Sequence, residues 1–240
     1  MFDSYQNPYV VAEAPADVRA TFIRKTYAHL AGAIAALVAI ELILFSVPGL
    51  KDTALNLMLG GKYNWLFVIG GFMIASWLAN KWAMSSTSLG MQYAGLGLYV
   101  FAQAVIFFPI LIIAADERFL NQPAIIGQAA IITGFMFGGL TLVAFTTKKD
   151  FSFLSGILKI GGLVALGLIV ASIFMGFNLG IWFSGAMVLI ASVSILYNTS
   201  NIIHHYGTTQ YVAASLGLFA SVALLFFYVL RILMALSGRD

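Results

Sequence analysis

A few charged side chains lie well inside the long apolar stretches of this sequence, where charge is costly and therefore often marks function. Arg231 lies about two turns before the end of the last stretch, so its guanidinium needs the outer interface or an acidic partner. Glu41 lies towards the same side in the first stretch and is a candidate partner; the alternative is that it reaches the interface or pairs with another neighbour. Lys159 lies about one turn inside the fifth stretch, and its long stem can reach back to the surface. The sequence therefore singles out Arg231 and Glu41 as candidates for an intramembrane ion pair.

Two adjacent histidines, His204 and His205, end the sixth apolar stretch. Imidazole groups titrate near neutral pH, so these two residues are candidates for pH sensitivity. Neighbouring residues on a helix point about 100° apart, which makes them a poor pair of ligands for one metal ion. No metal site is predicted.

Motifs of known catalytic chemistry are missing from the sequence. It contains no HExxH pair for zinc hydrolysis, no GxSxG nucleophile turn and no GxxxxGK[ST] phosphate loop. Zero cysteines exclude disulfides and thiolate metal sites. The last apolar stretch has no lysine, which excludes a retinal Schiff base. We therefore predict a protein that is not an enzyme and carries no cofactor; a serine protease using His204 with a distant serine is the one catalytic alternative.

The elements that position these residues are long apolar stretches. Hydrophobic residues make up 61% of the chain and charged residues 9%. A helix needs about 20 apolar residues to cross the hydrocarbon, because its backbone polar groups must be satisfied within the segment. Stretches of that length cover residues 26–47, 64–82, 89–114, 123–147, 154–177, 180–204 and 209–236. We predict an all-α integral membrane protein with one seven-helix domain over residues 26–240, preceded by a mobile tail over residues 1–25.

Basic residues beside the stretches predict the orientation in the membrane. With a cytoplasmic N-terminus, six lie inside and four outside: Arg19, Arg24, Lys25, Lys81, Lys148 and Lys149 against Lys51, Lys62, Arg118 and Arg239. The bias favours a cytoplasmic tail and, with seven crossings, a C-terminus on the far side. The basic residues form no stripe that could neutralise a run of phosphates, so no nucleic-acid partner is predicted.

Small residues are expected to let the helices approach closely, because lipid gives no hydrophobic drive for helix association. Gly134 and Gly138 form a GxxxG step, and Gly217 with Ser221 forms a looser pair of small residues. We expect these positions to be packing contacts.

The loop between the fourth and fifth stretches reads FTTKKDFSFL, from Phe145 to Leu154. Lys148 and Lys149 can anchor to an anionic leaflet, and Asp150 can cap the next helix. This string resembles the signature of the Bax inhibitor-1 family, also called the transmembrane Bax inhibitor motif family. Further similar segments are Phe108-Pro109-Ile110, LYNTSNIIHH over residues 196–205, and Arg231 with the closing Ser-Gly-Arg-Asp over residues 237–240.

The resemblance is greatest to the bacterial YccA-like branch of that family. It implies a bundle whose last helix is wrapped by the other six, in a bacterial inner membrane. It also implies partners besides the lipid bilayer, namely the membrane protease FtsH and its stomatin-like partners, with the protein as a substrate that modulates the protease. The predicted tail would then be a segment that the protease can pull.

Other members of the family are described as pH-sensitive calcium leak channels, in which two acidic side chains share a proton. The matching positions in this chain are Asn198 and Ser221, which cannot ionise. They can still form a hydrogen bond, at about 0.6 to 2 kcal/mol in lipid. The resemblance therefore favours a non-enzymatic protease modulator first, a weak cation leak channel without the acidic latch second, and an accessory subunit of a larger membrane complex third.

Overall fold

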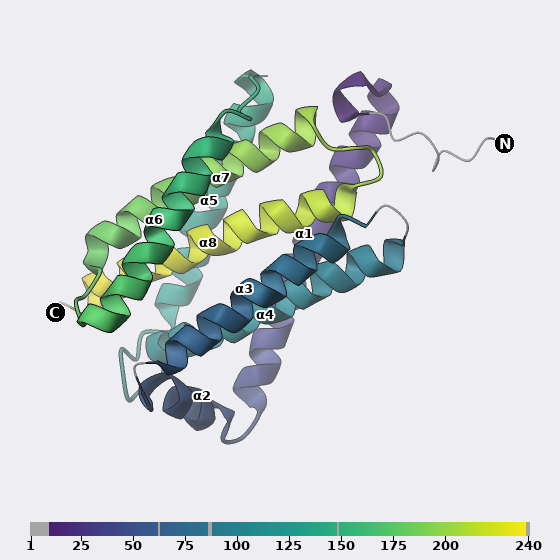
Figure 1. Ribbon diagram of the computed structural model, residues 1–240. Helices are drawn as coiled ribbons and strands as arrows, with labels where there is room; N and C mark the ends of the chain where they lie inside the picture. Colours follow the sequence, from purple (N-terminus) through teal and green to yellow (C-terminus); the bar gives the residue numbers. More distant parts are fainter. Residues whose placement is uncertain (1–9, 62, 86–87, 148, 239–240) are drawn as a thin grey trace.

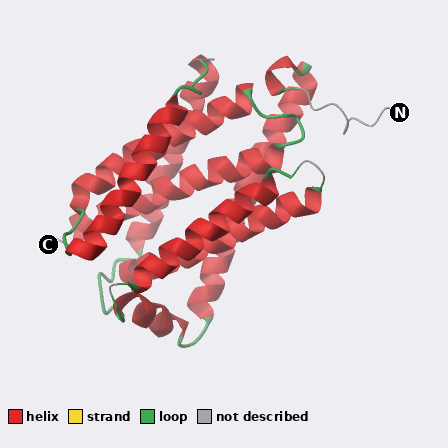
Figure 2. Cartoon of the chain, viewed as in Figure 1, coloured by secondary structure: helices red, strands yellow, loops and turns green. Residues whose placement is uncertain are grey.

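The structure is a computed structural model that describes residues 10–61, 63–85, 88–147 and 149–238. Lys148 of the predicted loop signature, Lys62, and the closing Arg239 and Asp240 lie outside the described residues. Figures 1 and 2 show a bundle of helices joined by short loops. Its long helices are α1 (Ala16–Ser46), α3 (Asn64–Ala83), α4 (Leu89–Ala115), α5 (Ala124–Thr147), α6 (Leu154–Met175), α7 (Gly180–His204) and α8 (Tyr211–Ser237).

All seven long helices have the length and hydropathy needed to cross a membrane. Large apolar side chains such as Phe67, Phe135 and Trp182 are exposed on the outside of the bundle. Apolar surface of that extent is unusual in a soluble monomer and is typical of a lipid-facing surface. The chain is therefore an all-α, multi-span membrane protein, as the sequence predicts. We call the side where α1 begins the N-terminal side of the bundle and the other the opposite side.

The first helix corrects the expected boundary of the N-terminal tail. α1 begins at Ala16, ten residues before the predicted span, and a 3-10 helix, η1 (Val11–Glu13), precedes it. Phe22 and Thr26 are buried within the bundle. Hydropathy marks only the part of a helix that can lie in lipid, so it misses the polar first turns. Residues 10–25 thus belong to the folded body; residues 1–9 lie outside the described part of the chain.

A short helix on the opposite side was not predicted. α2 (Leu50–Leu59) follows Gly49, whose left-handed backbone (φ 77°) turns the chain after α1. Its ten residues are too few to span a membrane. Leu55 packs against Phe108 and Ile112 of α4, so α2 closes one end of the bundle.

The last helix lies at the centre of the bundle. α8 packs against α1, α3, α4, α5 and α7, and Figure 1 shows it crossing the middle of the molecule. Buried residues such as Leu216, Leu218 and Phe219 lie on several of its faces, as expected for an enclosed helix. α6 packs mainly on α7 and meets α8 through the cluster of Ala165, Met187 and Tyr228. The central position of the last helix is confirmed, with α6 in an outer layer.

The tightest contact of a described glycine with a neighbouring helix joins α3 to α4. A Cβ atom at Gly95 would lie 2.5 Å from the carbonyl oxygen of Ala79 and 2.7 Å from the backbone nitrogen of Ala83. Backbone atoms of a packed helix cannot yield as a flexible side chain can. By contrast, a Cβ at Gly134 or Gly138 would meet no atom within 4 Å, so the predicted GxxxG packing contact is wrong for the described structure.

Replacing Gly95 with alanine should push α3 away from α4 and lower the free energy of unfolding by about 1 to 3 kcal/mol. Denaturation of the purified protein in mixed micelles measures this change. Gly97→Ala is the matched control on the same helix, because its Cβ would have open space. Equal stability of the two variants would contradict the assignment of Gly95 as the close contact.

Candidate functional site

A polar network links α7 to α8 in the half of the bundle nearer the N-terminal side. The amide nitrogen of Asn198 lies 2.9 Å from Ser221 Oγ, and Ser194 Oγ lies 2.7 Å from the same oxygen. Asn198 also donates to the carbonyl oxygen of Ser194, at 3.0 Å. The hydrogen bond expected between Asn198 and Ser221 is therefore present. Ser194 was not predicted as a member.

Gly217 makes room for this network on α8. A Cβ atom there would lie only 2.9 Å from Asn198 Oδ1. Ser221 Oγ lies 3.1 Å from the Gly217 carbonyl oxygen, one turn earlier on the same helix. The expected pairing of Gly217 with Ser221 as small residues at a helix contact thus has a specific purpose, which is to admit the Asn198 side chain.

A cavity of about 570 Å³ extends along α8 from this network. Asn198 and Ser221 line one part of it and Arg231 another. Ten residues of helix separate Ser221 from Arg231, or about 15 Å along α8. Among the described residues that line it, the side chains with polar atoms are Trp65, Tyr99, Gln103, Ser172, Asn178, Ser194, Asn198, Ser221, Tyr228 and Arg231, without a carboxylate.

The candidate ion pair between Arg231 and Glu41 is not formed. Arg231 lies with its guanidinium carbon 5.9 Å from the ring centre of Tyr228, in the cavity beside α7. Glu41 lines a different cavity, between α1, α4, α5 and α8, and neither of its carboxyl oxygens has a hydrogen-bond partner within the described residues. The sequence places both residues near the same end of their helices. In the structure they line different cavities, which lie on opposite sides of α8.

The loop between α5 and α6 is tied to the end of α7. Asp150 Oδ2 lies 2.9 Å from His205 Nε2, and the backbone nitrogen of Phe151 donates to Ser200 Oγ at 2.9 Å. Asp150 Oδ1 accepts from the backbone nitrogen of Ser152 at 2.8 Å. Lys149 is exposed.

Asp150 does not cap α6 as predicted. α6 begins at Leu154, and the residue before it, Phe153, makes no side-chain cap. The Asp150 carboxylate instead turns the loop on itself and holds it to His205. The backbone N–H of Ser152 and the His205 side chain together lower the pKa of Asp150 to about 2.

The side chains of His204 and His205 lie in different environments. Their ring centres are 6.2 Å apart with planes inclined by 58°. His205 contacts Asp150, whereas His204 Nε2 is buried without a hydrogen-bond partner in the described structure. No cluster of three or more metal-ligating side chains occurs among the described residues.

The start of the folded chain docks on the loop between α7 and α8. The backbone nitrogen of Val11 donates to the Tyr206 carbonyl oxygen at 2.9 Å, and Val10 pairs with Gly207 as an antiparallel bridge. The Val11 side chain is fully buried. The loop is itself held by Gln210, whose side-chain oxygen accepts from the Gly207 nitrogen at 2.8 Å. This clip between residues 10–11 and 206–207 was not predicted.

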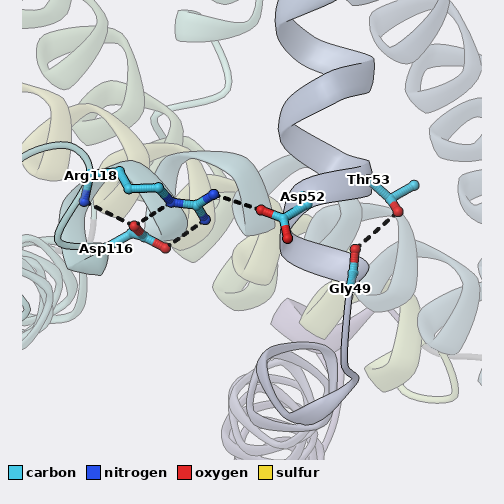
Figure 3. Close-up of polar contacts among 5 residues, drawn as sticks. All are labelled: Gly49, Asp52, Thr53, Asp116 and Arg118. Atoms are coloured by element: carbon cyan, nitrogen blue, oxygen red, sulfur yellow. Dashed lines mark hydrogen bonds and ion pairs between the residues drawn. The ribbon is translucent and has the colours of Figure 1, made fainter.

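On the opposite side, an ion network joins α2 to the loop between α4 and α5. Figure 3 shows Arg118 in contact with both Asp116 and Asp52. Its guanidinium lies 2.8 Å from Asp116 Oδ1 and 2.6 Å from Asp52 Oδ1. The Arg118 guanidinium lowers the pKa of Asp116 below its usual range. Asp52 in α2 lies far in sequence from Asp116 and Arg118 in the α4–α5 loop, so the sequence gave no signal for this contact.

Comparison with known proteins places the chain in a family. The profile of the family described as "Inhibitor of apoptosis-promoting Bax1" matches residues 19–238. The chain belongs to the Bax inhibitor family. An uncharacterized protein of Pseudomonas aeruginosa is 39% identical over 123 residues, which is 50% of this chain and 54% of that protein. The Escherichia coli protein named "Modulator of FtsH protease YccA" is 41% identical over 111 residues, 43% of this chain and 50% of that protein.

A Bax inhibitor family member from Schizosaccharomyces pombe, "Bax inhibitor 1", is 27% identical over 240 residues, or 99% of this chain and 85% of that protein. The chain spans about half the length of the two bacterial relatives. The family resemblance inferred from the sequence motifs is confirmed, and a YccA-like bacterial branch fits these relatives.

The Asn198–Ser221 contact should have a measurable coupling energy. Single and double alanine variants of Asn198 and Ser221, unfolded in mixed micelles, should give a coupling of about 0.6 to 2 kcal/mol. Ser192→Ala is the control, because its hydroxyl bonds only within α7, to the Val188 carbonyl oxygen. Additive effects of the two substitutions would contradict a direct contact.

The Asp150 pKa should depend on His205. His205→Leu should raise it from about 2 towards the ordinary value near 3.9, because one stabilising hydrogen bond is lost. A folded-state pKa below the ordinary one stabilises the fold above about pH 4, and this contribution is lost as pH falls towards about 2. Carbon NMR titration of the carboxyl measures the change. His204→Leu should leave the Asp150 pKa unchanged, and an equal effect of both variants would refute the contact.

Proposed function

We propose that this chain is a non-enzymatic protein of a bacterial inner membrane that modulates the protease FtsH as a substrate of it. The observation that carries this proposal is the similarity to the Escherichia coli protein named as a modulator of that protease. Its N-terminus lies in the cytoplasm and its C-terminus outside, in keeping with the bias of the basic residues. Stomatin-like partners of the protease belong to the same proposal.

The clip at residues 10–11 supports this function. The clip consists of the bridge from Val10 to Gly207, the backbone hydrogen bond from Val11 to Tyr206, and the buried side chain of Val11. A protease that pulls on the N-terminus breaks these few contacts first. They lie on the loop that joins α7 to α8, and the Tyr206 hydroxyl is 3.5 Å from the Cβ position of Gly217. Pulling at the N-terminus therefore acts first on the part of the bundle that carries the Asn198 network.

Weakening the clip should speed degradation, because it removes the first barrier to unfolding. Val11→Asp buries an unpaired charge in the clip, so its half-life in cells that contain FtsH should fall by about twofold or more. Deletion of residues 1–9 should lengthen the half-life by removing the segment that is pulled. Val18→Asp, at an exposed position in the first turn of α1, is the matched control. Equal half-lives of all variants with and without the protease would contradict the proposal.

Cation passage is the second candidate function, and the polar cavity along α8 is the observation that favours it. The described lining offers amide, hydroxyl and phenol groups but also the positive charge of Arg231, whereas Ca²⁺ prefers carboxylate oxygens. Because the lining lacks carboxylates and carries a positive charge, we rank a weak cation leak second to modulation of the protease. A measurement of Ca²⁺ flux into liposomes that contain the protein tests the leak directly. An accessory role in a larger membrane complex is the third candidate and would show as stable co-purification with proteins other than the protease.

A further inference from the structure

A second cavity, of about 580 Å³, lies between α1, α4, α5 and α8 on the other side of the central helix. Its wall is formed by aliphatic and aromatic side chains, among them Phe107, Phe137 and Phe219. A volume of this size suits a small ligand or a lipid chain. The polar side chains among its described lining residues are Glu41 of α1 and Thr133 of α5.

Both polar side chains are buried without partners. Glu41 is 7% exposed and Thr133 is 4% exposed. Neither carboxyl oxygen of Glu41, nor the hydroxyl oxygen of Thr133, forms a hydrogen bond to any described residue. A buried polar group without a partner costs about 1 to 3 kcal/mol, and more when it can carry charge. Two such groups facing one cavity are not explained by packing.

The cavity is accessible from the lipid-facing surface. Val38 and Leu42 line it and are also exposed, at 53% and 66%. On the α5 wall, a Cβ at Gly134 would meet nothing within 4 Å, so the wall is hollow at that point. A molecule dissolved in the bilayer can therefore enter sideways between α1 and α5 without crossing the protein.

The depth of the two polar groups suits the head of an amphiphile. Glu41 lies five residues before the end of α1 at Ser46, or about 8 Å along the helix. Thr133 lies nine residues into α5, about 13 Å from its start. A head group held between them would lie one to three turns below the opposite side of the bundle, with its chain against the phenylalanines.

We propose that this cavity binds a lipid-like alcohol, a single apolar chain whose hydroxyl group bonds to Glu41 and Thr133. A hydroxyl both donates and accepts, so it can satisfy a carboxyl oxygen and a threonine hydroxyl together. An amine donates but cannot accept when protonated, and it must be stripped of water to enter hydrocarbon. A carboxylate ligand accepts only and is repelled by a second carboxylate. The alcohol is the head group that bonds to both side chains without bringing a second charge into the hydrocarbon.

Three ligands with the same chain separate these chemistries: dodecanol, dodecylamine and dodecanoate, added to the full-length protein in nanodiscs. Native mass spectrometry of retained ligand and the thermal unfolding midpoint measure binding. Dodecanol should bind about tenfold more tightly than dodecanoate or dodecylamine and should raise the midpoint. Equal retention of all three, which is expected if bilayer chains simply fill the cavity, overturns the proposal, as does a preference for the amine.

Variants test the two named side chains. Glu41→Leu and Thr133→Val should each reduce the preference for dodecanol by about tenfold or remove it. Glu41→Gln should keep it, because the amide oxygen still accepts a hydrogen bond from the ligand hydroxyl. Gln103→Leu is the control, since Gln103 is buried on α4 but lines the other cavity. If Glu41→Leu fails to fold, the comparison of the three ligands on the unmodified protein and on Glu41→Gln still tests the proposal. An unchanged preference in Thr133→Val overturns the assigned site.

Discussion

Hydrocarbon offers no hydrogen bonds, so each polar group that this chain places between its helices must find its partner inside the protein. The Asn198, Ser194 and Ser221 network meets that requirement at the contact between α7 and α8. It uses neutral groups throughout, and Gly217 provides the space that lets the asparagine approach α8. The central helix is thereby fixed to a neighbour by contacts that bear no charge and do not titrate near neutral pH.

The central helix also separates two cavities of unlike chemistry. The cavity beside α7 is lined in one part by the hydrogen-bonded network of Asn198, Ser194 and Ser221 and in another part by Arg231. The cavity beside α1 is apolar except for Glu41 and Thr133, which have no partner among the described residues. The same physical rule that explains the first cavity thus identifies the second as a binding site for a molecule able to supply the missing hydrogen bonds. α8 forms part of both walls, which connects the two through one rigid element.

Sequence reasoning reached the seven spanning helices because length and hydropathy are set by the bilayer alone. It reached the Asn198–Ser221 contact through a family resemblance. It failed where the outcome depends on the direction in which a side chain points around its helix axis. Glu41 and Arg231 have matching depths, but their helices turn them into different cavities, and no pattern in one sequence gives that rotation. Gly95 and not Gly134 makes the close contact for the same reason. The clip at Val11 depends on where the α7–α8 loop ends in space, which local sequence does not encode.

The central claim is that a neutral contact holds α7 to α8 regardless of pH. The sequence contains no cysteine, so spin labels can be attached at two introduced cysteines without background. Leu189 on α7 and Leu236 on α8 are exposed positions on the two helices that the contact joins. Pulsed electron paramagnetic resonance in nanodiscs should give a single distance distribution that is the same from about pH 5 to pH 8. A second population that grows as pH changes would contradict the account.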